Sequence, residues 1–321
     1  MKHIKHQIAL IYKAAKVYIS DAKHYVRHSL LSGYQTSEEK FLRMITLRAH
    51  VVEKGLTMPD MKLNFGEENI LLLLDLCFEY LDKKYDTKRT MFLEAVRVLV
   101  EYGNVHAKQG VPVHAKIEAG IRRLKEAFPA LQAGEQPEVH ADELFQRGDF
   151  YYVANHRHSV RHFTGHIDMS DVIRALDLAR TAPSACNRQP VKVHIIPRSD
   201  RFDRLLQLQH GNRGFGSDAE YLLVLTVMED GYNGIAERNA MYIDGGIFIM
   251  NLLYSLQYYS IASCTLNCSF LPDEEKTLAS ILQTEDVAVA MIAIGSCPDT
   301  FRVARSTRIP LDEIIINQSA R

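Results

Sequence analysis

Two arginines and a serine stand at alternate positions of residues 157–161, which have the sequence RHSVR. In an extended chain alternate side chains point to the same side, so Arg157, Ser159 and Arg161 would share one face. Each guanidinium can donate two charge-assisted hydrogen bonds to an anionic group. The spacing therefore indicates a phosphate-binding site. An ordinary basic surface can carry the same residues, and this alternative stays open for the segment by itself.

A second polar cluster lies in residues 182–190, which have the sequence APSACNRQP. The two prolines disfavour helical backbone at the residues before them, so a stiff loop is expected between a helix and a strand. This loop presents Ser184, Asn187 and Gln189. Amide side chains both donate and accept hydrogen bonds, as the edge of a heterocycle requires of its partners. The alternative is a tight connection whose polar side chains bond to their own backbone.

Basic residues follow the last predicted strand. The chain passes Gly295 and Pro298, and then reaches Arg305 and Arg308, with Arg308 in an Arg-Ile-Pro sequence. Segments that follow strands often carry the sites of sheet proteins, so these arginines are candidates for binding an anion. The alternative is a solvated C-terminal segment.

The order and spacing of these motifs resemble those of the nitroreductase family of flavoproteins. The chain has R-x-S-x-R, then A-P-S-x-x-N-x-Q-P, then a long apolar helix from Asp244, then G-x-x-P and R-x-P. The resemblance covers about residues 157–315. It implies a nitroreductase-like mixed sheet surrounded by helices, and a homodimer that holds FMN at the subunit interface.

The resemblance also implies roles for individual residues. In the family, the first motif holds the phosphate and ribityl chain, the second reaches the same flavin from the other subunit, and a late basic residue joins the phosphate site. The usual second basic residue, two positions before Arg308, is Ser306 here, and Arg305 is the expected substitute. The residues expected to bind the cofactor are Arg157, His158, Ser159, Arg161, Pro183, Ser184, Ala185, Asn187, Gln189, Thr265, Leu266, Asn267, Arg305 and Arg308.

The expected chemistry needs no catalytic side chain, because a flavin carries the redox reaction and the protein positions it. The resemblance implies a ping-pong mechanism, in which NADH or NADPH gives a hydride to flavin N5 and a small acceptor then takes its place. Two alternatives remain open. One is the flavin-dependent dehydrogenation of a bound substrate, and the other is a non-catalytic, membrane-peripheral scaffold that retains the fold.

A further resemblance lies in the N-terminal half. The sequence HVVEKGL at residues 50–56, followed by Met-Pro and by Asn-Phe-Gly at residues 64–66, is similar to a signature of a nitroreductase subgroup found with surface-polysaccharide genes. On a helix, His50, Glu53 and Lys54 share a face. They could contact a substrate over the flavin, or they could form a local charge pair where the helix ends at Gly55.

The first 28 residues have an unusual charge, with six basic residues against one acidic residue, a net charge of +5. Apolar residues recur there at helical spacing. Such a helix could lie weakly on an anionic membrane surface, or it could pack its apolar stripe on the rest of the protein.

The remaining pattern predicts an all-α domain over residues 1–145 and the FMN-binding domain over residues 146–321. Turn residues cluster between them, and helical periodicity gives way to mixed helices and strands. The second half therefore indicates an α+β fold with helices around one mixed sheet. Strands are expected at 191–196, 221–228 and 287–294, and a long helix at 244–259.

Bulk composition excludes several classes of protein. The net charge is −1, which argues against nucleic-acid binding. No apolar run reaches the length of about 20 residues that a membrane span needs. The five cysteines are scattered, as in a cytoplasmic protein, and neither they nor the histidines near residue 160 match a standard metal motif. No metal is expected.

Overall fold

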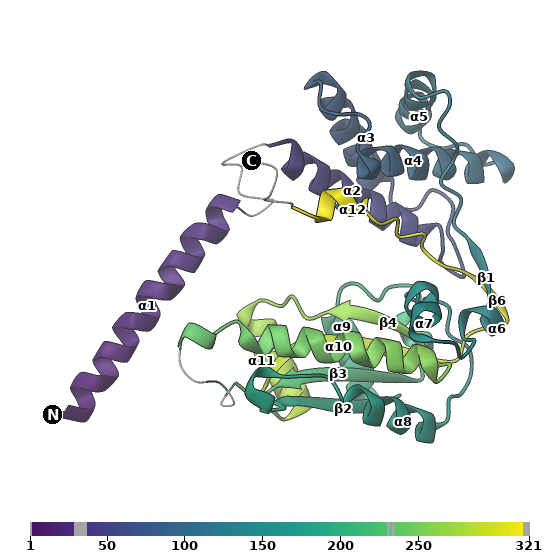
Figure 1. The fold of residues 1–321 in the computed structure, drawn as a ribbon. Helices are drawn as coiled ribbons and strands as arrows, with labels where there is room; N and C mark the ends of the chain where they lie inside the picture. The colour runs from purple at the N-terminus through teal and green to yellow at the C-terminus, as the bar shows by residue number, and fades with distance from the viewer. Residues whose placement is uncertain (1, 29–36, 230–231, 233–234, 317–321) are drawn as a thin grey trace. The chain divides into compact units, whose positions relative to one another are not determined.

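A computed structural model describes residues 2–28, 37–229, 232 and 235–316, and it divides the chain into two compact units (Figure 1). The helical unit comprises Met1–Thr57, Met61–Pro137 and Ala304–Arg321, and the sheet unit comprises Met58–Asp60 and Glu138–Val303. The sequence predicted one division at residue 145. In the structure the second unit begins earlier, and the last residues return to the first unit.

Four helices form the core of the helical unit: α2 (Glu38–Gly55), α3 (Glu67–Asp82), α4 (Thr90–Lys108) and α5 (Ala115–Ala127). Helix α2 begins at Ser37, whose side chain accepts the N–H of Lys40. Apolar residues on one face of each helix meet in a single core. The ring of Tyr80 stacks there on Phe92, so the predicted helical region is confirmed.

The C-terminal segment returns to this unit and is held by hydrogen bonds. The Ser306 N–H donates to Glu53 at 2.7 Å, and the Arg305 N–H donates to Gln136 at 3.0 Å. Helix α12 (Leu311–Ile314) follows. These contacts explain why residues 304–321 separate from the sheet unit.

Helix α1 (Lys2–His28) is amphipathic, as its sequence predicts, but its apolar side chains are not buried. Ile8 is 61% exposed and Ile11 is 69% exposed. One of the two expectations was that this apolar stripe packs on the rest of the protein, and the structure does not show such packing. No helix among the described residues is long and apolar enough to cross a membrane.

The sheet unit contains a four-stranded sheet in the order β2-β3-β5-β4. Its strands are β2 (Val191–Pro197), β3 (Tyr221–Val227), β4 (Ala262–Asn267) and β5 (Val287–Gly295). A separate two-stranded sheet joins β1 (Glu138–His140) to β6 (Thr300–Arg302).

All three strand pairings in the larger sheet are antiparallel. The α+β class with helices around a sheet is confirmed. The sequence pattern had predicted a sheet of mixed direction instead, because periodicity identifies a strand without fixing the direction of its neighbours.

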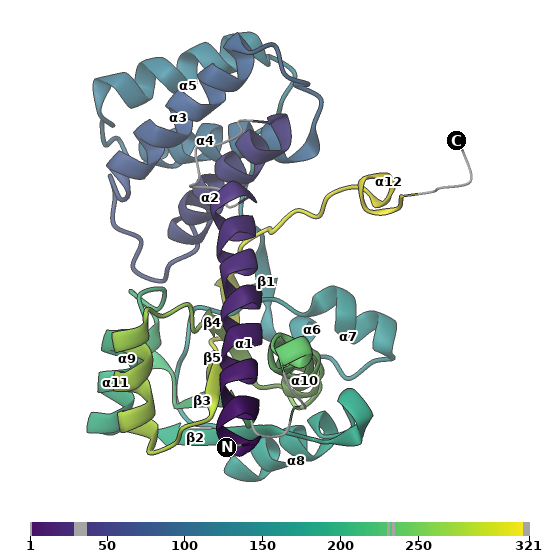
Figure 2. The same ribbon diagram turned by 90° about the vertical axis from the view of Figure 1, so that its left-hand side faces the viewer.

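Helices cover both faces of this sheet (Figure 2). Helices α9 (Asp200–Leu208) and α11 (Pro272–Leu282) pack on one face, together with Leu222 and Val224 of β3. Helices α8 (Met169–Ala179) and α10 (Ala240–Tyr258) pack on the other face, with Leu223 and Leu225. Successive strand residues point to opposite faces, so the apolar run of β3 supplies both cores.

Helix α10 is apolar on nearly all sides, which is unusual for a helix at the surface of a unit. Its inner face contributes Leu252 and Leu256 to the core. Its outer face exposes a stripe formed by Tyr242, Ile243, Ile247 and Met250. In the sheet unit, this stripe is a surface that water contacts directly.

The remaining elements connect these layers. They are the short helices α6 (Ala141–Leu144) and α7 (Phe150–His156), and the 3-10 turns η1 (Ala185–Asn187), η2 (Gly216–Asp218) and η4 (Ile235–Glu237). Of the two motifs that the sequence singled out, helix α7 directly precedes the first and turn η1 lies within the second.

Candidate functional site

The segment of residues 157–161 begins where helix α7 ends. Arg157 is the C-cap residue and has extended backbone angles. The N–H of Val160 then donates to the carbonyl of Ser263 at 2.9 Å, at the start of β4. The buried Val160 side chain joins the core beneath. The segment is therefore fixed against one end of the sheet.

Arg161 is a buried arginine, with 9% of its surface exposed. Its guanidinium donates to the carbonyl of Ser159 at 3.5 Å, and within the part of the chain that the structure describes no carboxylate pairs with it. A buried charge ordinarily has an ionic partner, because its transfer out of water is costly. Arg157, His158 and Ser159 are half-buried beside it. The environment of Arg161 therefore fits an anion such as a phosphate.

The loop at residues 182–190 has strained backbone. Cys186, Asn187 and Gln189 have positive φ angles of 51°, 57° and 50°. Residues other than glycine adopt this region at a cost of about 1 kcal/mol or more each, and they keep it where surrounding contacts enforce it. The hydrogen bonds that hold this loop therefore matter for its shape.

Asp244 of α10 holds the loop from outside. Its carboxylate, 4% exposed, accepts the Ala185 N–H at 3.0 Å and the Tyr232 hydroxyl at 2.9 Å. Burial raises the pKa of Tyr232, and its hydrogen bond to Asp244 raises it further. The phenol thus remains a donor to Asp244 at neutral pH.

Arg188 forms a second connection. It donates to both carboxylate oxygens of Glu237, at 2.8 Å and 3.3 Å, and its guanidinium lies 4.9 Å from the centre of the Tyr232 ring. The sequence predictions did not include Asp244, Arg188 or Glu237. One signal could have found Asp244, because it is the only charged residue in α10.

Inside the loop, polar side chains also bond to the loop itself. The Ser184 hydroxyl accepts the Gln189 N–H at 2.9 Å, and the Gln189 amide donates to the Asn187 side chain at 3.2 Å. This is the tight connection that was the alternative expectation for these residues. Pro183, Asn187 and Gln189 nevertheless remain exposed, so their outer surfaces are accessible to a ligand.

Residues Thr265, Leu266 and Asn267 lie in the second half of β4. Thr265 and Asn267 are exposed, whereas the Leu266 side chain is buried in the core. Any contact of Leu266 with a ligand would therefore involve its backbone.

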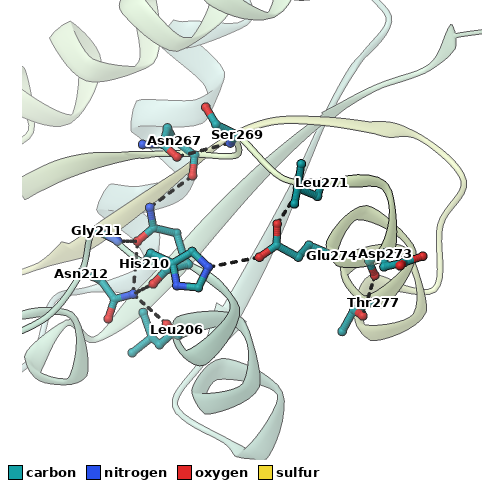
Figure 3. Close-up of polar contacts among 11 residues, drawn as sticks. Leu206, His210, Gly211, Asn212, Asn267, Ser269, Leu271, Asp273, Glu274 and Thr277 are labelled. Carbon is teal, nitrogen blue, oxygen red and sulfur yellow. Dashed lines mark hydrogen bonds and ion pairs between the residues drawn. The ribbon is translucent and has the colours of Figure 1, made fainter. Parts of the chain in front are cut away.

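A buried polar network fixes the end of β4 (Figure 3). The Gln209 amide donates to the carbonyl of Asn267 at 3.3 Å and accepts the Gly211 N–H at 2.7 Å. Nearby, His210 contacts Glu274 at 3.1 Å. The Leu271 N–H and His210 together lower the pKa of Glu274.

The two central motifs lie at opposite ends of the sheet unit. Residues 157–161 contact β4 at Ser263, which pairs with Ile294 near the end of β5. The loop precedes Val191, which pairs with Val227, and Val227 pairs with Val287 at the start of β5. Strands rise about 3.3 Å per residue, so roughly 20 Å of β5 separates the two ends. One chain does not bring these motifs together.

The other arginines of the expected site belong to the helical unit. Arg305 and Arg308 are exposed, and Arg308 donates to the carbonyl of Ser306. Ser306 has a positive φ of 47°. Its N–H bond to Glu53, described above, holds this turn against α2.

The His50 motif has internal contacts. One Glu53 oxygen lies 2.7 Å from His50, while the other accepts the Ser306 N–H. These contacts correspond to the local pairing that was one of its two expected roles.

The described residues contain no group of three or more histidine, cysteine or acidic side chains that could hold a metal ion. His166, for example, contacts Glu220 at 3.0 Å.

Comparisons with solved structures give similar folds for about half of the chain. A nitroreductase family protein from Streptococcus pneumoniae TIGR4 is 22% identical, with a TM-score of 0.46, and the match covers 53% of this chain and 100% of that one. A nitroreductase candidate in complex with FMN, from Exiguobacterium sibiricum 255-15, is 17% identical, with a TM-score of 0.46, over 53% of this chain and 98% of that one.

A nitroreductase family protein from Clostridium difficile 630 is 20% identical, with a TM-score of 0.45, over 53% of this chain and 99% of that one. No curated protein matches the chain.

The family comparison is more specific about position. It matches residues 154–296, which contain the R-x-S-x-R segment, the strained loop and all four strands of the larger sheet, to the Nitroreductase family.

Proposed function

We propose that the sheet unit binds FMN and that the protein is an FMN-dependent NAD(P)H oxidoreductase. The observation that carries this proposal is the buried Arg161, which has no carboxylate partner among the described residues. It lies within the segment that matches the Nitroreductase family. A cofactor phosphate would supply the missing negative charge.

The family resemblance, together with the places of the residues in the fold, supports the following proposed roles. Arg161, with Arg157 and Ser159, would hold the phosphate and ribityl chain at the end of α7. The exposed amides of Asn187 and Gln189 would bond to the edge of the flavin ring. Asp244 would act indirectly, by keeping this loop in its strained shape. Further candidates are His158, Pro183, Ser184, Ala185, Thr265, Leu266, Asn267, Arg305 and Arg308.

When bound, the flavin supplies the redox chemistry, accepting a hydride from NADH or NADPH and passing it to a small acceptor in a ping-pong sequence. The protein's own residues would bind and orient the cofactor. No side chain is required as a nucleophile or general base.

We infer a homodimer from the separation of the two motifs. Residues 157–161 and the loop at 182–190 lie at opposite ends of one sheet unit, so a flavin held by both requires two copies of the chain. The exposed apolar stripe of α10 supports this assembly, because such a stripe is characteristic of an interface. Two-fold symmetry would give two equivalent sites.

The link to surface-polysaccharide synthesis is a finer part of the proposal and rests on the signature at residues 50–66 alone. A cytoplasmic location likewise rests on the scattered cysteines, none of which forms a disulfide in the structure. Both remain predictions.

The visible absorbance of the purified protein tests the cofactor assignment. We expect a yellow protein that releases FMN on denaturation. Arg161→Ala should weaken FMN binding by about 10-fold to 100-fold, because a charge-assisted hydrogen bond contributes about 1.5–3 kcal/mol. Arg204→Ala, at an exposed position of α9, is the matched control and should bind FMN normally.

A protein that is colourless and does not bind added FMN would refute the proposal. The non-catalytic scaffold would then be the better account of the protein. If FMN binds, its bleaching by NADH or by NADPH under anaerobic conditions identifies the electron donor. Bleaching by neither would refute the reductase activity while leaving the FMN site intact.

A further inference from the structure

Helix α1 has two chemically different faces, and both are exposed. One face carries Ile8, Ile11, Tyr18 and Ile19, each more than half exposed. At about 100° per residue, these side chains cover an arc at least as wide as the stripe by which a surface helix normally contacts its core. A helix of this length would gain stability if that arc were covered.

The opposite face of α1 is basic. Lys13, Lys16 and Lys23 are exposed there, and His6 lies on the same side. Asp21 is the single acidic residue among the first 28 positions, which have a net charge of +5. The surface that covers the apolar arc must therefore also be compatible with a concentrated positive charge.

We propose that α1 lies on the surface of an anionic lipid bilayer, with its apolar arc in the interface and its lysines near the headgroups. Charge complementarity carries this assignment. A basic amphipathic helix binds such a surface through buried apolar area together with electrostatic attraction to acidic lipids.

Tyr12 and Tyr18 lie at the two edges of the apolar arc and are 72% and 54% exposed. Tyrosine places its ring in an apolar environment while its hydroxyl stays hydrated, so it suits the boundary between lipid and water. Lys16 lies just beyond the Tyr12 edge, where a long side chain can extend its ammonium toward the headgroups. Around the helix, apolar, aromatic and basic residues thus follow one another in the order in which a bilayer changes from lipid chains to headgroups.

A second copy of α1 would cover the apolar arc less favourably. Pairing two such helices through their apolar arcs would leave both basic faces pointing outward, with one aspartate from each helix to offset them. Such a pair provides no new negative charge for the lysines. An anionic surface instead provides negative charge to every lysine on the polar side.

Co-sedimentation of the full-length protein with lipid vesicles tests the proposal. We expect binding to vesicles of phosphatidylcholine that contain about one third phosphatidylglycerol, and little binding to pure phosphatidylcholine. Binding should decrease strongly at about 1 M salt, where the Debye length is about 3 Å. This readout does not involve flavin, so its failure would leave the proposed oxidoreductase activity untouched.

Double variants separate the electrostatic contribution to lipid binding from the apolar contribution. Lys13→Gln with Lys16→Gln should weaken binding to anionic vesicles by about 30-fold, since each basic residue near the surface contributes about fivefold. The matched control, Lys13→Arg with Lys16→Arg, keeps the charge and should bind like the wild type. Ile8→Ser with Ile11→Ser should weaken binding by at least about 100-fold, because both side chains would no longer bury apolar area.

Three outcomes would overturn the proposal. The first is no binding to anionic vesicles at low salt. The second is equal binding by the wild type and both loss-of-function variants. The third is a lower oligomeric mass of Ile8→Ser with Ile11→Ser by sedimentation velocity, without any effect on lipid binding, which would assign the apolar arc to a second copy. An unchanged thermal unfolding midpoint would show that the variants fold normally.

Discussion

Asp244 is a buried carboxylate in an otherwise apolar helix, and its hydrogen-bond donors come from two separate segments of the sheet unit. One donor is the backbone N–H of Ala185, in the strained turn, and the other is the Tyr232 hydroxyl. A buried donor that loses its acceptor costs about 1–3 kcal/mol. Asp244 therefore stabilises both the unit and the particular shape of the loop.

Two substitutions of Asp244 test its role as a hydrogen-bond acceptor. We expect Asp244→Ala to destabilise the flavin-free protein by about 1–3 kcal/mol, because two half-buried donors lose their acceptor. Asp244→Asn keeps one acceptor oxygen and should cost about half as much. Chemical denaturation measures both values, and an Asp244→Ala variant as stable as the wild type would contradict the role of Asp244 in holding the loop.

His194 makes the stability of the sheet unit depend on pH. Burial lowers the pKa of His194, which lies on β2 and contacts Thr226 at 3.1 Å. The unfolded chain binds a proton near pH 6.5, whereas the folded protein keeps this ring neutral to lower pH. The stability from neutral His194 is thus fully present above about pH 6.5 and is lost as the pH falls through the lowered folded pKa.

His194→Gln should therefore reduce the loss of thermal stability between about pH 7.5 and about pH 5. The matched control, His6→Gln, is at an exposed position of α1 and should leave that loss unchanged. Differential scanning calorimetry at the two pH values provides the comparison. An identical pH response in both variants would show that His194 titrates normally in the folded protein.

At the level of residues, the sequence identified candidates but not their connections. The motif spacing indicated Arg161 as an anion-binding residue, and the structure adds that it is buried without a carboxylate partner among the described residues. The contact of Asp244 with Ala185 joins positions 59 residues apart. Local periodicity carries no information about such a pair, so only the fold could reveal it.

Helices α2 and α3 are joined by a segment in which Gly55 and Phe65 are in close contact. A Cβ atom built on Gly55 would lie 2.0 Å from Phe65 Cε2. The Phe65 ring is itself held edge-on against Tyr102, with 5.3 Å between ring centres. These two members of the N-terminal signature thus have a packing role that does not depend on any substrate.

Gly55→Ala is expected to destabilise the helical unit by about 1–3 kcal/mol, because overpacking outweighs the gain of about 1 kcal/mol that alanine usually brings to a helix. The double variant Gly55→Ala with Phe65→Leu should recover part of this loss by making space for the methyl group. Denaturation midpoints of the two variants test the prediction. Greater stability of Gly55→Ala than of the wild type would contradict the steric explanation.

At the level of elements, periodicity predicted the strongly patterned segments well. The strands expected at residues 191–196 and 221–228 agree with β2 and β3 to within one residue. Strand β4 was not predicted, because its sequence ASCTLN mixes small and polar residues. The short pair β1 and β6 was also missed, since strands of three residues have too few positions to show a period.

The proposed dimer would form through the outer face of α10. Ile243 and Ile247 are 61% and 39% exposed in the single chain. In a symmetric dimer each substitution acts twice, so Ile243→Gln with Ile247→Gln should weaken association by several kcal/mol. Sedimentation velocity should show a monomer that has also lost FMN, because neither chain alone brings both motifs together.

Leu271→Gln is the matched control for this prediction, since Leu271 is 72% exposed at the start of α11, on the other face of the sheet. It should remain dimeric and bind FMN. If the α10 variant remained a dimer with bound FMN, another surface would form the interface. If it became a monomer that still bound FMN, a single chain would suffice for the site.

The pairing of β1 with β6 means that the chain enters and leaves the sheet unit side by side, with Glu138 opposite Arg302. The sheet unit is thus an insertion within the helical unit. A ribosome completes the inserted unit before it makes residues 304–321. During synthesis, Glu53 therefore gains its Ser306 partner only after the whole sheet unit has been made, so the helical unit begins first and is completed after the sheet unit.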